Sequence, residues 1–501
     1  MYRRRVAIDD AKIEPVSPTR RSLRASTGEI VMSAPAVAAP PDAAETMAPE
    51  VTTVPDAAPA ALAWLDPTDV ARATYATAGM DVSSAEPAAD DLLEGRGLTS
   101  AVRPATVLPV ALVLLVVAVY AVTALVWPLN AVTPEVGAVQ VQPAAAAPAS
   151  PAWPAGGSAA VAVQGIGAPL ASTTDATPMA SITKLVTALL VLEELPLQVG
   201  EQGPDYAFTF RDRAEYYDYL ADGQSALNVP VGGTLSEYQM LQAMLIGSAN
   251  NYADRLAASL WPNDTVFAAA AQRYLSRHGL TGITVVDPSG FDPGNTADPG
   301  SLVPLAERAL ANPVIAEIVA TPSVKLPGAG TVENTNALLA DPGVVGLKTG
   351  TLDRYTLLAA KDATIGDTTV RLYAAVLGQP NAKTRFAATR DLFAQLESEV
   401  QLIPAVTAGT TAGRVTTAWG ESVDVVAAAD AAVVLWNGAT PAATITLDLA
   451  GGAEKGDVVG SLTVTGPLDT ETVDLKLADD VEGPSPWWRL THPVELFGLG
   501  G

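Results

Sequence analysis

An uncharged, almost wholly apolar run at residues 105–129 constrains this chain more than any other feature of its sequence. As a helix the run would extend roughly 37 Å, which is enough to cross the hydrocarbon core of a bilayer. Trp127 lies near its end, where an aromatic anchor at the membrane interface is expected. A buried core helix is the alternative, although the run has no polar face. We therefore predict a transmembrane helix at 105–129.

Basic residues before this run predict its orientation. Arg96 and Arg103 precede the run, and no lysine or arginine follows it until Lys184. The positive-inside rule places the preceding residues in the cytoplasm and everything after residue 129 outside. About a hundred residues lie ahead of the run, so it is not a conventional cleaved signal peptide. We predict a single-pass type II protein of the cell membrane.

The segments on either side of the run have compositions that do not support a packed core. Residues 1–104 are rich in proline, alanine, threonine and acidic residues, so we predict a disordered cytoplasmic tail. Its short apolar stretches at 61–65 and 91–94 allow a cytoplasmic partner, although the composition favours a passive tail. Residues 130–157 are rich in proline and alanine. We predict an extended, semi-rigid linker that holds the next domain off the bilayer.

The composition of the 501-residue chain excludes several kinds of chemistry. Because the chain has no cysteine, it has no thiol nucleophile, thiolate metal site or disulfide. His278 and His492 are its only histidines, which excludes a His-rich metal site and disfavours a Ser-His-Asp triad. A net charge of −25 argues against a nucleic-acid partner. We expect no metal and no cofactor, and any serine chemistry is expected to use lysine.

Residues 179–193 have the apolar spacing of a helix, with Ser181 and Lys184 near its start. The two side chains are three residues apart and therefore neighbours on one helical face. A serine hydroxyl is a weak nucleophile that needs a base within hydrogen-bond reach, and a desolvated lysine amine can serve as that base. The helix N-terminus also offers free N–H groups to an oxyanion. Alone, this S-x-x-K pattern is weak evidence, because an exposed first turn often carries such a pair.

Two further short motifs follow along the chain. Ser248-Ala-Asn250 lies between two predicted helices, and Lys348-Thr349-Gly350 lies on a predicted strand. Each alone is explained by an ordinary capping turn or edge strand. The order S-x-x-K, S-x-N, K-T-G is the signature of penicillin-recognising serine enzymes. With Asp287-Pro-Ser-Gly290 and Asn334-Thr-Asn336 as further matches, residues 158–400 resemble the low-molecular-mass penicillin-binding proteins, the serine D-alanyl-D-alanine carboxypeptidases.

The resemblance implies an α/β (α+β) domain like those of penicillin-binding proteins and serine β-lactamases. In that fold a mainly antiparallel sheet is flanked by helices, an all-helical subdomain is inserted, and the active site lies between them. Residues 401–484 contain short alternating strands separated by turns, which predicts a small all-β domain that serves as a spacer or docking module. Residues 485–501 form a C-terminal tail whose packing the sequence leaves open.

The resemblance also implies a catalytic sequence. Lys184 would take the proton from Ser181, whose oxygen attacks the penultimate carbonyl of a peptidoglycan stem peptide ending in D-Ala-D-Ala. Ser248 would relay a proton to the departing amine, and Asn250 would hold the peptide backbone and Lys184. Water would then release the acyl-enzyme. β-Lactam antibiotics, which mimic this substrate, are the expected inhibitors.

The residues of the third motif are expected to bind the substrate. Lys348 and Thr349 would hold the terminal carboxylate, and Lys348 would also help to keep Lys184 neutral through like-charge repulsion. After Gly350, the backbone N–H of Thr351 would complete the oxyanion hole together with that of the nucleophilic serine. The family usually has an aromatic residue and threonine next, whereas this chain has bulky side chains at 354 and 355, which we expect near the cleft mouth.

Two other functions remain open from the sequence. A class A β-lactamase needs an acid that activates the deacylating water. The acid nearest to the third motif is Glu333, fifteen residues before Lys348 in a carboxypeptidase-like context, which disfavours this alternative. A penicillin-binding sensor or division-complex scaffold would be acylated but would hardly turn over. The long tail favours a partner role, whereas the complete set of motifs favours activity.

Overall fold

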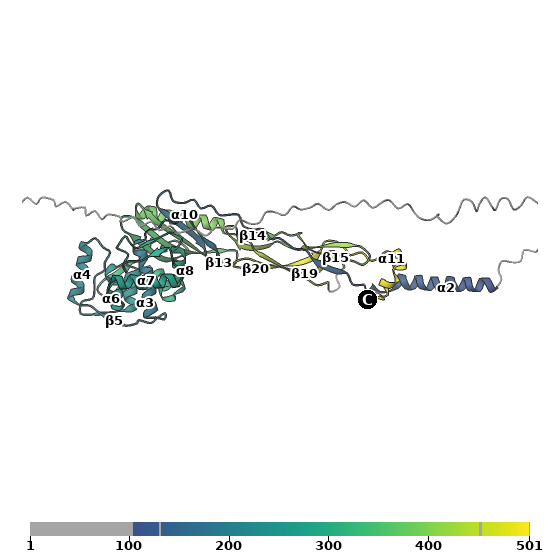
Figure 1. The fold of residues 1–501 in the computed structure, drawn as a ribbon, viewed down its shortest axis with the longest axis horizontal. Coiled ribbons are helices and arrows are strands. Elements are labelled where there is room, and N and C mark those ends of the chain that lie inside the picture. The colour runs from purple at the N-terminus through teal and green to yellow at the C-terminus, as the bar shows by residue number, and fades with distance from the viewer. Residues whose placement is uncertain (1–103, 130–131, 450–452, 500–501) are drawn as a thin grey trace, which may run out of the picture. The chain divides into compact units, whose positions relative to one another are not determined.

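The computed structural model describes residues 104–129, 132–449 and 453–499, so the predicted disordered tail lies outside it except for residue 104. The first described element is α2 (Pro104–Val126), labelled in Figure 1. Its segment Val107–Val126 is long and apolar enough to cross a membrane, and most of its side chains are exposed. An apolar helix that no protein core covers has the character of a membrane span.

A five-stranded antiparallel sheet, in the order β11-β12-β13-β2-β3, organises the region after residue 157. Its strands are β2 (Ser158–Val163), β3 (Ile166–Ala171), β11 (Val344–Thr351), β12 (Tyr355–Ile365) and β13 (Thr368–Gln379). Alternate side chains of a strand point to opposite faces. In β2, Ala160 and Ala162 therefore join the core shared with the helices, whereas Ala159 and Val161 join the core under α10 (Ala382–Glu399). The sheet is buried on both faces.

Between β3 and β11 the chain is mainly helical, as the sequence predicts. Ser181 lies in the short 3-10 turn η2 (Ala180–Ile182), which leads into α3 (Thr183–Glu194). Nearly every residue of α3 is buried, so this helix runs through the core of the helical region. The other helices are α4 (Phe210–Ala221), α5 (Glu237–Leu245), α6 (Asn250–Leu260), α7 (Asp264–Arg277), α8 (Leu302–Ala311), α9 (Pro313–Ala320) and the 3-10 turn η3 (Ala337–Ala340).

Short two-residue to four-residue strands connect these helices. They are β4 (Thr177–Pro178), β5 (Asp205–Ala207), β6 (Thr234–Ser236), β7 (Ile283–Thr284), β8 (Thr296–Ala297), β9 (Ser323–Leu326) and β10 (Gly330–Glu333). β4 pairs with β8, which ties the segment just before Ser181 to the loop that follows residue 287. These pairings bring segments far apart in the sequence to one site.

The remaining strands form the all-β domain that the alternating pattern predicts. They are β14 (Gln401–Val406), β15 (Thr411–Thr416), β16 (Ser422–Ala427), β17 (Ala431–Leu435), β18 (Ala442–Leu447), β19 (Val458–Thr465) and β20 (Thr470–Leu477). A six-stranded sheet and the β14-β17 pair enclose a core of their own. The predicted fold class, a mixed helix-and-sheet domain followed by an all-β domain, is confirmed for the described residues.

Residues 132–157, the described part of the predicted linker, pair with the all-β domain and do not only extend away from the membrane span. β1 (Glu135–Ala138) pairs with β15 and forms an edge of the six-stranded sheet. The following backbone N–H groups donate to the all-β domain, from Val139 to Ala412, from Ala144 to Ala405 and from Ala146 to Ala439. The N–H of Ala152 then donates to the Gln395 side chain on α10. The extended conformation of these residues agrees with their composition. They are not a free linker, however, because the open edge of the six-stranded sheet at β15 pairs with this extended segment.

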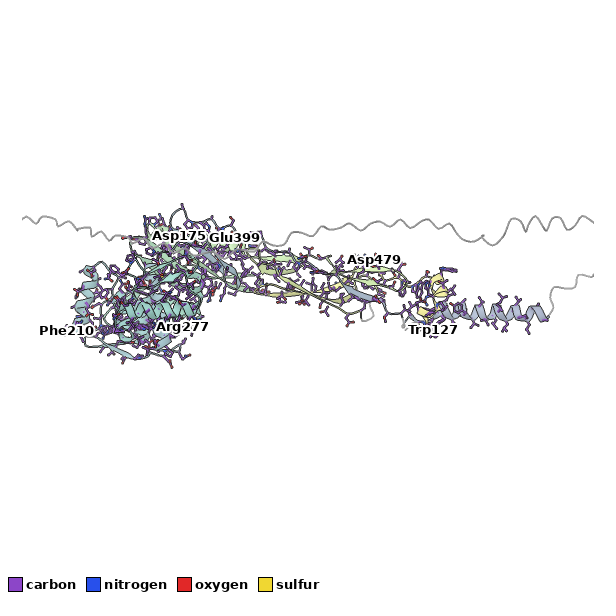
Figure 2. All side chains as sticks on the ribbon, viewed as in Figure 1. Trp127, Asp175, Phe210, Arg277, Glu399 and Asp479 are labelled. Carbon is purple, nitrogen blue, oxygen red and sulfur yellow. The ribbon has the colours of Figure 1, made fainter. Side chains whose placement is uncertain are left out.

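The C-terminal tail, whose packing the sequence left open, forms α11 (Pro486–Thr491) and α12 (Pro493–Leu496), and α11 contacts α2. The Tyr120 hydroxyl donates to the Leu490 carbonyl over 2.7 Å, and Arg489 donates to the Trp127 carbonyl over 2.8 Å. The rings of Trp127 and Phe497 meet edge to face, with centroids 4.9 Å apart. Figure 2 labels Trp127 at this junction. The C-terminal tail therefore meets the end of the predicted span.

Candidate active site

Ser181 lies in a tight turn that its neighbours hold in a strained conformation. The preceding residue, Ala180, has a left-handed φ of 51°. This conformation costs a non-glycine residue about 1–2 kcal/mol. The Thr183 hydroxyl donates to the Ala180 carbonyl over 2.8 Å, and the Thr356 hydroxyl donates to the Met179 carbonyl over 3.2 Å. Such strain persists where the surroundings over-determine the backbone, as they do around functional side chains.

Two glycines pack directly against this turn. A Cβ atom on Gly290 would overlap the carbonyl oxygen of Ala180, and one on Gly350 would overlap the Thr356 hydroxyl and the Met179 carbonyl. Gly290 also has a left-handed φ of 79°. Close approach of two backbones therefore requires glycine at both positions. The Asp-Pro-Ser-Gly loop and β11 hold the Ser181 turn from two sides.

Lys184 lies one helical turn after Ser181 and is fully buried. Its Nζ is 2.8 Å from Ser181 Oγ and 2.7 Å from Asn250 Oδ1, and it also donates to the Ser289 carbonyl. A neutral amine has two N–H groups and one lone pair. With the N–H groups directed at Asn250 and Ser289, the lone pair is free to accept the proton of Ser181.

Burial determines the charge of Lys184. Desolvation lowers its pKa to about 7, and the carboxylates of Asp254 and Asp287 partly oppose this effect. The sequence instead predicted that the charge of Lys348 would help to keep Lys184 neutral. Lys348 is itself fully buried, and its pKa is lowered well below its usual value by burial and then by the charges of Lys184 and Arg385. The shift at Lys184 is therefore attributed to desolvation.

Ser248 and Asn250 come from the turn between α5 and α6. Ser248 is almost fully buried and has a left-handed φ of 58°. Asn250 begins α6, and its Nδ2 donates to Gln224 Oε1 over 2.7 Å while its backbone N–H donates to the Ser225 carbonyl over 2.7 Å. The loop after α4 is therefore tied to the residue that contacts Lys184.

The K-T-G motif lies on β11, next to the Ser181 turn. A β-bulge between Val344 and Gly346 precedes it, and Leu347 has a positive φ of 90°. Bulges near sites re-aim the side chains that follow them. Lys348 Nζ donates to the Thr349 carbonyl over 3.0 Å, and the Thr349 hydroxyl is 2.7 Å from that of Thr335.

A pocket of about 450 Å³ opens onto Ser181. Its walls come from the loop after α4, from Asn250, from the loop after Gly290 and from the end of β11; the lining residues are Ser181, Gly223, Gln224, Ser225, Asn250, Gly290, Phe291, Pro293, Thr351, Leu352 and Asp353. Lys184 and Lys348 are buried away from solvent. Ser181 of the first motif, Asn250 of the second and Thr351, directly after the third, therefore meet at one pocket, although they are far apart in the sequence.

Comparison with known proteins agrees with this arrangement. Residues 170–381 match the profile of the D-alanyl-D-alanine carboxypeptidase family. The D-alanyl-D-alanine carboxypeptidase DacB2 of Mycobacterium tuberculosis is 33% identical over 194 residues, which are 37% of this chain and 60% of the length of that protein. Residues 170–381 therefore resemble this family, and the chain spans about 60% of the length of this curated relative.

Solved structures of penicillin-binding proteins are also similar to this chain. Penicillin binding protein 6B from Escherichia coli is 20% identical and has a TM-score of 0.47; the match covers 65% of this chain and 96% of that one. Penicillin binding protein 5 from Haemophilus influenzae is 19% identical and has a TM-score of 0.45, with 69% and 99% of the two chains covered.

The region that resembles the carboxypeptidase family departs from the sequence expectation at the cleft mouth. Tyr355 packs over the guanidinium of Arg385, 5.6 Å from its ring centroid, so its ring faces α10. The pocket edge is lined by Leu352 and Asp353 instead. Arg385 is almost fully buried, and its Nη1 donates to the carbonyls of Gly350 and Thr356 over 3.1 and 3.2 Å. Arg385 therefore holds the end of β11 against β12.

Several residues around the site carried no signal of their own in the sequence. The carbonyl of Ser289 accepts a hydrogen bond from Lys184. In the sequence, only the Asp-Pro-Ser-Gly motif that contains Ser289 pointed to this position. Gln224, in the loop after α4, accepts from Asn250, and Asp254 on α6 accepts from Tyr219 and acts on Lys184 through its charge. The spacing of Asn250 and Asp254, four residues apart on one helix, would have placed both on the same face.

Proposed function

We propose that this chain is a membrane-anchored serine carboxypeptidase that removes the terminal D-alanine from peptidoglycan stem peptides ending in D-Ala-D-Ala. One observation carries the proposal: a buried lysine, Lys184, whose pKa is about 7, lies 2.8 Å from the hydroxyl of Ser181 at the floor of a pocket. This is the arrangement that a serine nucleophile needs for activation without histidine.

In the first step, neutral Lys184 accepts the proton of Ser181 while Oγ attacks the penultimate carbonyl. The resulting oxyanion requires hydrogen-bond donors that are already in place. The backbone N–H groups of Ser181 and Thr351 are the donors that we assign, because both residues line the pocket. The strained turn at Ala180 fixes the direction of the first of them.

The substrate carboxylate is assigned to Lys348 and Thr349 beside Gly350. Lys348 is buried with a depressed pKa, so a carboxylate arriving next to it favours the charged ammonium and gains a charge-assisted hydrogen bond. Ser248 is assigned the transfer of a proton to the departing D-alanine amine, and Asn250 the positioning of Lys184 and the peptide. Water then hydrolyses the acyl-enzyme.

The membrane anchor is α2, and we propose that the residues after it face the outside of the cell. The basic residues before the span, Arg96 and Arg103, support this orientation. The contacts of Arg489 and Leu490 with α2 hold the C-terminal tail at the same end of the span. β-Lactam antibiotics are the expected inhibitors, and the all-β domain is assigned a spacer role.

The test is release of D-alanine from an acyl-D-Ala-D-Ala peptide by the full chain in detergent. We expect steady release by the wild type, none by Ser181→Ala, and normal release by Ser276→Ala, a control at an exposed serine on α7. Equal release by the wild type and Ser181→Ala would refute the proposed nucleophile. Acylation of Ser181 without D-alanine release would support a sensor instead.

A further inference from the structure

Helix α4 directs its apolar side chains to solvent and its polar side chains toward the protein. Its apolar side chains point to solvent: Phe210 is 79%, Tyr217 59% and Leu220 45% exposed. None of its residues is buried. A surface helix normally directs its apolar stripe at the core. An exposed apolar stripe on a folded domain marks an interaction surface. Figure 2 labels Phe210 on this helix.

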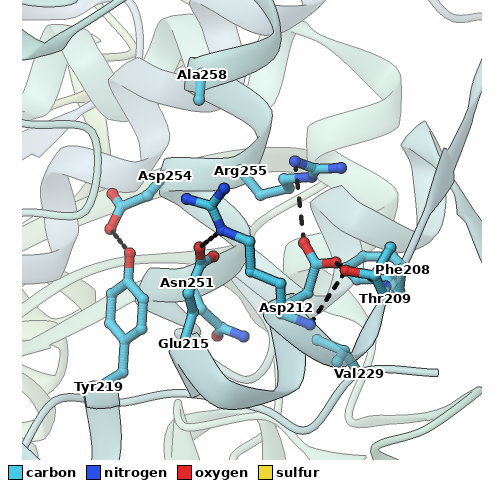
Figure 3. A pocket seen from close by; sticks show the side chains of 11 residues that line it. Phe208, Thr209, Asp212, Glu215, Tyr219, Val229, Asn251, Asp254, Arg255 and Ala258 are labelled. Atoms are coloured by element: carbon cyan, nitrogen blue, oxygen red, sulfur yellow. Dashed lines mark hydrogen bonds and ion pairs between the residues drawn. The ribbon is translucent and has the colours of Figure 1, made fainter. Parts of the chain in front are cut away.

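The inner face of α4 is polar and rests over a second pocket, shown in Figure 3. This pocket has a volume of about 510 Å³. Across it, the Tyr219 hydroxyl donates to Asp254 over 2.5 Å, and Asp212 lies 3.9 Å from Arg255. Charged and polar contacts therefore hold α4 in place, and its apolar face remains free.

The exposed stripe is narrow, and the C-terminal end of its helix leads into a loop that lines the pocket at Ser181. Phe210 and Tyr217 are seven residues apart and share one helical face, and the twelve-residue helix is roughly 18 Å long. A stable protein dimer needs about 800 Å² from each partner, which is more than one such stripe offers. The loop directly after α4 contributes Gly223, Gln224 and Ser225 to the pocket that contains Ser181. The C-terminal end of α4 is thus linked by two residues of chain, Asp222 and Gly223, to the wall of the candidate active site.

The chemistry of the stripe suits a sugar chain. Aromatic rings such as those of Phe210 and Tyr217 offer flat apolar faces to the C–H faces of pyranose rings. On the flank of the helix, at the rim of the second pocket, Arg211 and Glu215 form an exposed ion pair of 2.9 Å, whose groups can donate to and accept from sugar hydroxyls and acetamido groups. The net charge of −25 disfavours an anionic lipid surface as the occupant.

We propose that the outer face of α4 binds the glycan strand to which the stem peptide is attached. The inference rests on the proposed function, because the substrate of that reaction is a peptide carried on a glycan. The strand would lie along Phe210, Tyr217 and Leu220 while its peptide enters the pocket at Ser181. The site would then favour peptides still attached to glycan over free peptides.

Binding is tested with the full chain and peptide-free glycan strands, which contain no cleavable bond. We expect Phe210→Leu with Tyr217→Leu to weaken binding about tenfold or more, since an aromatic contact of this kind contributes up to about a tenfold factor each. Phe210→Trp with Tyr217→Trp keeps the aromatic faces and should retain binding. Val199→Ser with Val266→Ser, at exposed apolar positions of the same region, is the matched control.

Kinetics separate this inference from the proposed function. The leucine variant should raise KM for a glycan-linked pentapeptide and leave kcat/KM for the free pentapeptide unchanged. Equal glycan binding by the wild type and the leucine variant would overturn the inference even if D-alanine release is normal. A change from dimer to monomer in the leucine variant would also overturn it, because the stripe would then serve a second copy. Glycan binding that depends on these residues without D-alanine release would support the site and refute the function.

Discussion

Among single residues, Lys184 must be neutral near pH 7 to accept the proton of Ser181. Because burial lowers the pKa of Lys184 to about 7, acylation of Ser181 by penicillin should rise as pH increases through 7 and level off above it. The Asp254 carboxylate raises the pKa of Lys184, so Asp254→Asn should lower that pKa and move the rising limb to lower pH. The measurement is the rate of acylation at a series of pH values from about 5 to about 9, roughly two units on each side of the pKa of Lys184.

The control for this prediction is Asp264→Asn. Asp264 influences Asp254 but is not among the charges that act on Lys184, so its replacement should leave the limb nearly unchanged. The pKa of Asp254 is itself raised to about 6 by burial. The rise of the acylation rate with pH therefore reflects the combined titration of Asp254 and Lys184. An unchanged limb in Asp254→Asn would show that Asp254 does not set the charge of Lys184.

At the scale of elements, the Ser181 turn requires glycine where the Asp-Pro-Ser-Gly loop meets it. Gly290→Ala should reduce acylation by about a hundredfold or more, because its Cβ would displace the Ala180 carbonyl and misplace Ser181. Gly279→Ala is the matched control: Gly279 has a similar φ of 71°, but nothing lies within 4 Å of its Cβ position. It should lose about 1–2 kcal/mol of stability and acylate normally. Equal acylation rates in the two variants would contradict this role of Gly290.

The elements also show what sequence reasoning could and could not predict. The helical turn that pairs Ser181 with Lys184 was predictable, because three-residue spacing on a helix is a local property. The alternation in 401–484 likewise predicted strands. β1 was missed, because its alanine and proline surroundings gave no strand signal and its partner β15 lies far along the chain. The Ser289 and Gln224 contacts were missed for the same reason, since tertiary packing alone brings them to the site.

In the whole molecule, we propose that α2 separates an N-terminal part inside the cell from the remaining residues outside it. Protease added to intact cells should remove the residues after α2 and leave the N-terminal tail intact, because Arg96 and Arg103 keep that end inside. Tags at the two termini and immunoblotting measure this. Lysed cells, in which both ends are cut, provide the control. Protection of the domain that contains Ser181 in intact cells would contradict both the orientation and a cell-wall role.

The central claim is that Ser181 forms an acyl-enzyme that turns over with peptide but is trapped by penicillin. A penicilloyl group stays attached after the ring opens and blocks the approach of water, whereas D-alanine diffuses away. The direct measurement is the intact mass of the full chain after a brief penicillin pulse, followed by peptide mapping. We predict an adduct on the peptide containing Ser181 that persists for many minutes. An adduct lost within seconds while hydrolysed penicillin accumulates would contradict the account and support a β-lactamase, with Asp353 at the pocket edge as the acid to examine first.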